Sequence, residues 1–248
     1  MSSRIYALIK VFDKEEYADA FIEKGELFCR TLGDFKGIED DEVRGDQFEA
    51  VTDWHQPAQI SITISYKDAE GVEHSHLLKD LTDPVIMQNK GYDELNIYCM
   101  YAIKVPNFKE SYETEEEKKH AEQKVRKLLQ ECFSVSEKAL AFGKFSVVVY
   151  RINDFISKVK MAAEKNNVAC WHKTVNYYDP DTFSGSFNGL DAAFSKRNCY
   201  QSQSEYRFVF ESNELSGPKT ISIGSLQELA FKVPTEDLDG LFEFQLAK

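Results

Sequence analysis

The chain has 248 residues, of which 42% are hydrophobic and 13% aromatic, so it can bury a core and is not intrinsically disordered. Its net charge of −12 argues against a protein that coats nucleic acid by bulk charge but leaves room for a local basic groove. Its first residues contain no apolar run long enough for a signal peptide, so we expect none. It has no apolar run of about 18 residues and no Cys-x-x-Cys pair among its five cysteines, so we expect a cytoplasmic protein with reduced thiols and no membrane segment.

The first part of the chain predicts mainly strands, because its apolar residues alternate with polar ones. The expected elements are a strand over 4–12, a helix over 14–24 ended by Gly25, a strand over 27–32, a polar loop over 33–49, a β-hairpin over 60–66 and 72–78 with its turn at 68–71, and a strand over 95–105.

The second part mixes helices and strands. Thr114 and Glu117 form a capping-box pattern that opens a helix to about 132. The remaining expected elements are a strand over 144–152, a helix to 165 capped by Asn153 and Asp154, a strand over 169–178, a loop over 179–198 with a helical turn at 190–194, and strands over 205–210, 220–223 and 241–246.

This uneven grouping of strands and helices predicts an α+β fold. We expect a mixed, mostly antiparallel sheet, open to being split, with three or four flanking helices. No repeat or clear linker is present, so residues 1–248 are expected to form a single domain.

The segment over 199–210 carries the strongest functional signal. On a strand, Gln203, Glu205 and Arg207 would share one face, opposite the aromatic residues. A carboxylate beside a ribose can stabilise the oxocarbenium-like transition state of N-glycosidic cleavage, and an amide two residues earlier can orient an acceptor. The alternative is an ordinary pair of strand-face charges. A packed interior ion pair, or a flat outer surface, would exclude the sugar chemistry.

The acidic loop over 39–49 is the second candidate. In one interpretation Arg44 binds a phosphate or carboxylate through its planar fork, with Asp46 or Glu49 orienting it. In another, Asp40, Asp46 and Glu49 bind a hard cation, as in a metal-dependent nuclease. The third is an exposed loop with one internal ion pair. His74 and His76 would share a strand face, but no third ligand is nearby in sequence, so we predict no metal site there.

Two resemblances rest on these segments. The central Arg44-Gly45-Asp46 loop with Glu49, and the late Lys196, Tyr200 and Glu205-Tyr-Arg207 segment, resemble a group of uncharacterised bacterial and phage-encoded proteins. Gln203-Ser-Glu205 is also similar to the Gln-x-Glu motif of ADP-ribosyltransferases. That resemblance implies a mixed α/β fold around a split sheet, NAD bound in a cleft, Glu205 as the catalytic glutamate and Gln203 as its acceptor-orienting partner.

The leading hypothesis is therefore an ADP-ribosyltransferase-like enzyme, a toxin or phage-defence effector. It would cleave NAD and transfer ADP-ribose to a protein or nucleic acid, with an antitoxin or immunity protein as a further partner. Arg44 or Arg30 would meet the pyrophosphate, and a tyrosine would stack on nicotinamide. The candidate tyrosines are Tyr6, Tyr98, Tyr101 and Tyr200. The rival hypothesis is a non-enzymatic binding module that uses the loop over 39–49.

Overall fold

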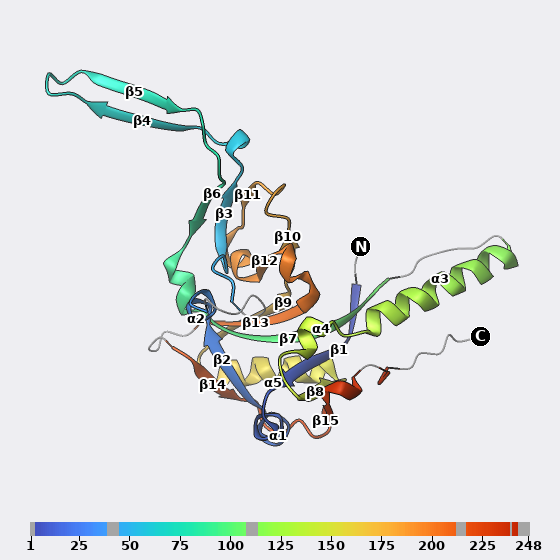
Figure 1. The fold of residues 1–248 in the computed structure, drawn as a ribbon. Coiled ribbons are helices and arrows are strands. Elements are labelled where there is room, and N and C mark those ends of the chain that lie inside the picture. The colour runs from blue at the N-terminus through green and yellow to red at the C-terminus, as the bar shows by residue number, and fades with distance from the viewer. Residues whose placement is uncertain (1–2, 39–44, 108–113, 212–216, 239, 243–248) are drawn as a thin grey trace. The chain divides into compact units, whose positions relative to one another are not determined.

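The computed structural model describes residues 3–38, 45–107, 114–211, 217–238 and 240–242 (Figure 1). The chain's internal contacts divide it into two compact units. Unit 1 comprises residues 1–31, 95–175 and 202–248, and unit 2 comprises residues 32–94 and 176–201. The single-domain expectation stays a prediction, and the two units are described separately.

Unit 1 is built on one sheet whose strand order is β14-β2-β7-β1-β8-β15, with β13 paired to β7 and β9 paired to β13. All of these pairs are antiparallel. The strands are β1 (Ser3–Phe12), β2 (Glu26–Thr31), β7 (Asn96–Pro106), β8 (Phe145–Val149), β9 (Ala169–Thr174), β13 (Glu205–Glu211), β14 (Lys219–Ser222) and β15 (Ala230–Pro234). The predicted α+β class with a mostly antiparallel sheet is confirmed.

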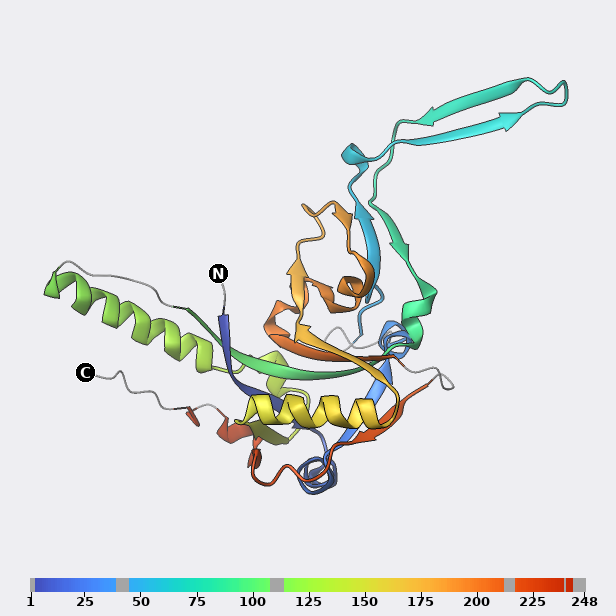
Figure 2. The same ribbon diagram turned by 180° about the vertical axis from the view of Figure 1, so that it is seen from behind.

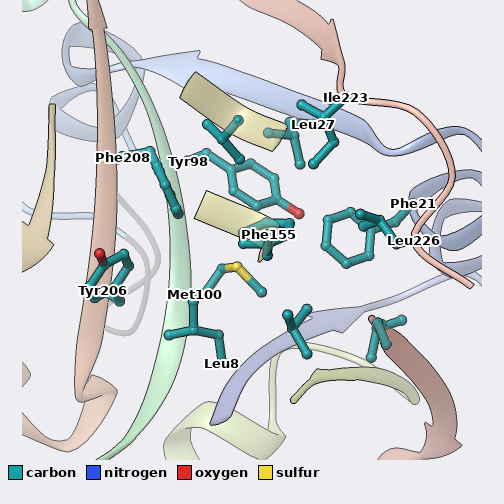
Figure 3. Packing of buried hydrophobic residues seen from close by; sticks show 14 of the residues in the cluster. Leu8, Phe21, Leu27, Tyr98, Met100, Phe155, Tyr206, Phe208, Ile223 and Leu226 are labelled. Carbon is teal, nitrogen blue, oxygen red and sulfur yellow. The ribbon is translucent and has the colours of Figure 1, made fainter. Parts of the chain in front are cut away.

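Helices cover both faces of this sheet, because alternate strand residues are apolar on both sides. Leu8 packs in a cluster with Phe21 of α1 (Glu15–Lys24) and Phe155 of α5 (Ile152–Lys165), and Figure 3 shows these side chains meeting around Tyr98. The neighbouring Ile9 points to the other face. Its cluster includes residues of α3 (Glu115–Phe133) and α4 (Glu137–Leu140). The short helix η5 (Thr235–Asp237) follows β15 in the chain.

Several local predictions are confirmed in unit 1. Gly25 ends α1 in the left-handed conformation at φ 64°, and Thr114 and Glu117 form both hydrogen bonds of the capping box. The prediction that Asn153 and Asp154 cap α5 was wrong. Arg151 is the N-cap residue, and it forms an ion pair with Asp154 in the first turn. The last described strand is β15, which was not predicted. Of the strand expected over 241–246, residues 241–242 are not strand and 243–248 lie outside the described residues.

The described residues of unit 2 form three small sheets. Its elements are α2 (Leu32–Lys36), β3 (Val51–His55), η1 (Pro57–Gln59), β4 (Ile62–Lys67), β5 (Glu73–Leu78), β6 (Val85–Gln88), η2 (Lys90–Glu94), β10 (Asn176–Tyr178), β11 (Gly185–Ser186), η3 (Gly189–Phe194) and β12 (Ser195–Arg197), and η4 (Asn198–Gln203) leads out of it. β11, β3 and β6 form one sheet, and β10 pairs with β12 in parallel. Its apolar core gathers around Trp54, Tyr178 and Val51.

The predicted β-hairpin is confirmed as β4 and β5, which pair only with each other among the described residues. Asp68 fixes its turn by accepting hydrogen bonds from the backbone N–H groups of Glu70 and Val72. Tyr66 stacks on His74 and His76, so the two histidines belong to an aromatic face of the hairpin. Within the described ranges, no helix is long and apolar enough to cross a membrane.

Candidate functional site

The Gln-x-Glu segment is not one continuous strand. Gln203 is the last residue of η4, and β13 begins at Glu205. Between them Ser204 has a φ of 41°, and its hydroxyl donates to the Ala102 carbonyl oxygen at 2.8 Å. Because this left-handed residue interrupts the alternation, the prediction that Gln203 and Glu205 lie on one strand face is wrong.

Glu205 is one half of an ion pair in the interior of unit 1. Arg207 Nε donates to Glu205 Oε1 at 2.7 Å, with the arginine side chain 0% and the glutamate side chain 6% exposed. The two residues are two apart on β13, so their side chains share a face, as predicted. This is the packed interior pair that we stated would exclude sugar chemistry at Glu205.

The surroundings of this pair are dry. Cys99 lies opposite Arg207 on β7, and burial, with Glu205 as the next cause, raises the pKa of its thiol well above the ordinary range. Burial also lowers the pKa of the Lys104 ammonium, while the Glu205 charge partly opposes that shift. Both shifts indicate a site with little water, where an ionic contact is costly to break by removing one partner.

The residues predicted to bind NAD belong to several elements, and one of them lies outside the described residues. Arg30 is exposed on β2, and Tyr6 is 48% exposed on β1. Neither makes a hydrogen bond or ion pair with Glu205 in the described part of the chain. Tyr200 belongs to unit 2, and Arg44 lies outside the described residues. The NAD site therefore stays a prediction, which no contact of Arg30 or Tyr6 with Glu205 supports.

The central loop and the late segment instead meet inside unit 2. Lys196 Nζ lies 3.0 Å from Glu49 Oε1, with side chains 5% and 1% exposed. Arg197 Nη2 donates to Asp46 Oδ1 at 2.8 Å, and the same Asp46 oxygen accepts the Phe48 backbone N–H at 3.0 Å. Two strand-borne cations thus neutralise the two acids that follow Gly45.

Tyr200 completes this group of residues, which we call the Asp46–Tyr200 cluster. Its members are Gly45, Asp46, Phe48, Glu49, Tyr178, Lys196, Arg197 and Tyr200. The Tyr200 hydroxyl donates to the Gly45 carbonyl oxygen at 2.6 Å, and the Lys196 ammonium lies 4.9 Å from the Tyr200 ring centroid. The Arg197 guanidinium lies 4.6 Å from the Phe48 ring centroid. Tyr200 therefore fixes the loop instead of presenting a free ring to a nicotinamide.

The acids of this cluster are poor candidates for metal ligands. Burial is the largest cause that raises the pKa of Asp46, the Glu49 charge adds to it, and Arg197 opposes it. Both acids already contact cations, and no group of three or more His, Cys, Asp or Glu in the described ranges is placed to hold a metal ion. Asp40, the third residue of the nuclease hypothesis, lies outside the described residues.

A basic hollow in unit 1 was missed by sequence reasoning. It has a volume of about 790 Å³ and lies between α5 and β14, which Figure 2 shows as neighbouring elements. Lys158, Lys165 and Lys219 line it, and none of its lining residues in the described part of the chain carries a carboxylate. Its other lining residues are Asn96, Met161, Ala162, Asn166, Val168, Phe210, Thr220, Ile221, Ser222, Ile223 and Gly224.

The local structure explains how the three lysines converge. Lys158 and Lys165 are seven residues apart on α5, with Met161 and Ala162 between them, and so occupy one helix face. Lys219 shares a strand face with Ile221, which packs on the same apolar cluster as Val159 of α5. The i, i+3, i+4, i+7 spacing of the α5 residues could be recognised in the sequence. The sequence did not show that β14 faces this side of the helix.

Comparison of the chain with protein-family models, curated proteins and solved structures found no match.

Proposed function

We propose that this chain is a non-enzymatic binding module that takes an anionic ligand in the lysine-lined hollow of unit 1. The observation that carries the proposal is the charge of the hollow: among the described residues, three ammonium groups and no carboxylate line it, in a chain whose net charge is −12. Acidic residues outnumber basic ones by 42 to 30, so the average composition of the chain would not predict that the charged lining residues are all lysines.

The shape of the hollow also supports this function. Its volume of about 790 Å³ falls within the range of ligand sites, about 300–1,000 Å³. Apolar side chains from β13 and β14, such as Phe210 and Ile221, provide a floor beneath the lysines. An anion held there would sit partly away from water, where an ionic contact is stronger than on an open surface.

The binding-module hypothesis is thus retained, with a different surface. The described acids of the loop over 39–49 contact Lys196 and Arg197 and are not available as an exposed recognition patch. An ADP-ribosyltransferase with NAD as substrate rests on sequence resemblance, without support from the geometry at Glu205. A cytoplasmic setting is part of the proposal, and five free cysteines favour such a reducing compartment.

The test measures the binding of three fluorescein-labelled anions by anisotropy at low salt: polyglutamate, a single-stranded DNA oligonucleotide and inorganic polyphosphate. The test variant carries Lys158→Glu, Lys165→Glu and Lys219→Glu. The control carries Lys67→Glu, Lys138→Glu and Lys160→Glu, three exposed lysines outside the hollow. Both variants make the net charge more negative by the same amount, so bulk charge cannot explain a difference between them.

We expect at least one anion to bind the native chain and the control, and to bind the test variant roughly 100-fold more weakly. An exposed ion pair contributes about 0.2–1 kcal/mol, and three charge reversals together remove roughly 3 kcal/mol. Binding should also weaken as salt is added. Equal binding by the two variants, or no binding of any anion by the native chain, would refute the proposal.

A further inference from the structure

We infer that the anion is an acidic peptide, which binds in extended conformation along the open edge of β14 and adds a strand to the sheet of unit 1. This inference rests on the anion-binding function proposed above and specifies the class of partner. Three features carry it: the position of β14 in the sheet, the way the hollow contacts β14, and the distribution of lysines and apolar side chains around it.

β14 is a terminal strand of the sheet. It pairs with β2, and no other strand of the described residues pairs with it. Figures 1 and 2 show it at the margin of unit 1, beside β2. A strand in this position presents a row of backbone donors and acceptors to which an extended chain can pair.

The register identifies which backbone groups face outward. The Ile223 N–H donates to the Gly25 carbonyl oxygen at 3.0 Å, one step beyond the pair Ser222↔Glu26. In an antiparallel pair, residues directed at the partner strand alternate with residues directed away from it. The backbone N–H and C=O groups of Thr220 and Ser222 therefore point away from β2, toward the open edge.

The hollow contacts every residue of this strand. All four residues of β14 line it, although side chains of consecutive strand residues point to opposite faces. A hollow that contacts consecutive residues reaches the backbone of the strand as well as the side chains of its inner face. A peptide held there can use the outward backbone groups of Thr220 and Ser222 while its alternate side chains turn toward α5.

The side chains opposite the edge define the peptide's composition. Lys158 and Lys165 are seven residues apart, about 10 Å along the helix, and Met161 and Ala162 lie between them. Alternate residues of an extended peptide are about 6.8 Å apart. The two glutamates of a Glu-x-Val-x-Glu sequence are about 13.6 Å apart, roughly 3 Å more than the two helix positions, a difference that the long lysine side chains can span. Such a sequence also places an apolar side chain between the two carboxylates, and Lys219 of β14 adds a third ammonium group.

The choice of a peptide over a nucleic acid follows from the same features. A nucleic acid could bind the lysines, but it has no regularly spaced backbone N–H and C=O groups to pair with those that point outward from β14. Among the described lining residues, Phe210 is the one aromatic residue, and it is buried in the core and so not exposed for base stacking. Only a polypeptide combines alternate acidic side chains with main-chain donors and acceptors at strand spacing.

The experiment uses the full chain and a fluorescein-labelled peptide, Thr-Glu-Thr-Val-Thr-Glu-Thr. Two N-methylated forms of the peptide each lack the N–H groups along one edge. We expect the unmodified peptide and one methylated form to bind equally, and the other form to bind at least 10-fold more weakly. Thr220→Pro removes an outward N–H without touching the ladder to β2 and should weaken binding by a similar factor, while Lys160→Glu should not.

The two failures are distinguishable. If polyphosphate or DNA binds in a manner that depends on the three lysines and the peptide does not, the inference is wrong and the anion-binding function stands. If both methylated peptides bind like the unmodified one, the lysines attract the peptide without strand addition, and the inference is again wrong. If no anion binds, both proposals fail. The peptide comparison does not depend on the folding of any variant.

Discussion

Replacing Glu205 with alanine tests whether this residue stabilises unit 1 or performs chemistry. Its carboxylate contacts Arg207 at 2.7 Å, and the arginine side chain is 0% exposed. Removing one partner of a buried ion pair destabilises a protein by about 3–5 kcal/mol, because the other charge stays in the interior. Arg207 has further interactions besides this contact, so we expect the lower end, about 3 kcal/mol.

This free energy corresponds to a measurable change in Tm. Unit 1 has roughly 160 residues, and an unfolding entropy of about 2.1 cal/mol/K per residue gives about 0.33 kcal/mol/K for the unit. A loss of about 3 kcal/mol should therefore lower its Tm by roughly 9 °C, measured by differential scanning calorimetry. Glu211→Ala is the matched control, because Glu211 is exposed at the end of the same strand and should matter by less than about 0.5 kcal/mol.

A second variant separates the loss of an ion pair from simple loss of packing. Glu205→Leu combined with Arg207→Met replaces both charges with apolar groups of similar size and should recover most of the Tm. A catalytic Glu205 predicts the opposite pattern, in which alanine abolishes NAD turnover and leaves the Tm unchanged. If Glu205→Ala melts within about 2 °C of both the native chain and Glu211→Ala, the structural argument is refuted.

Three further predictions concern single positions. Burial, with the Lys160 charge as the smaller cause, lowers the pKa of His172. The neutral imidazole therefore contributes stability that is complete above pH 6.5 and is lost as the pH falls through the lowered pKa. The urea midpoints measured at pH 8 and pH 5 should differ less in His172→Gln than in the native chain. Gly25→Ala should lower the free energy of unfolding by more than about 1 kcal/mol, because φ is 64° and the new Cβ would clash with the Gly224 carbonyl oxygen. An unchanged urea midpoint would contradict this. Tyr200→Phe should lower the unfolding free energy of unit 2 by about 1–3 kcal/mol, measured in urea, because a buried carbonyl oxygen loses its hydrogen bond; no change would show that this bond is not needed.

Elements with a strong local pattern were predictable from the sequence. The hairpin formed by β4 and β5 has clean alternation, and its turn contains Asp68 and Gly71, so its residues specify it without help from the rest of the chain. β3, β6 and β15 were missed because they are short and their alternation is weak. Their strand conformation depends on partners, as β15 depends on β8, and such partners are not visible in a local window.

The candidate sites show the same limit more sharply. The sequence identified the central loop and the late segment as informative, and the structure joins them through Asp46 and Arg197, which are 151 residues apart. Charge patterns left three interpretations of the loop open: a pocket wall around Arg44, a metal site, or an exposed loop with one internal ion pair. Nothing in a sequence window indicates that a cation from a distant strand already occupies them, because that contact exists only after the tertiary structure has formed.

The hollow of unit 1 illustrates why net charge is a weak guide to a binding partner. A chain with a formal charge of −12 would be expected to repel anions at long range, yet local potentials depend on which charges lie within a Debye length, about 8 Å at physiological salt. Lys158, Lys165 and Lys219 lie around one hollow. Whether β14 is an edge depends on strand order, which no property of its four residues determines. The ligand class that we propose rests on two tertiary features of the described residues, the edge position of β14 and the lysines around the hollow, and a partner that needs both is more specific than one selected by charge alone.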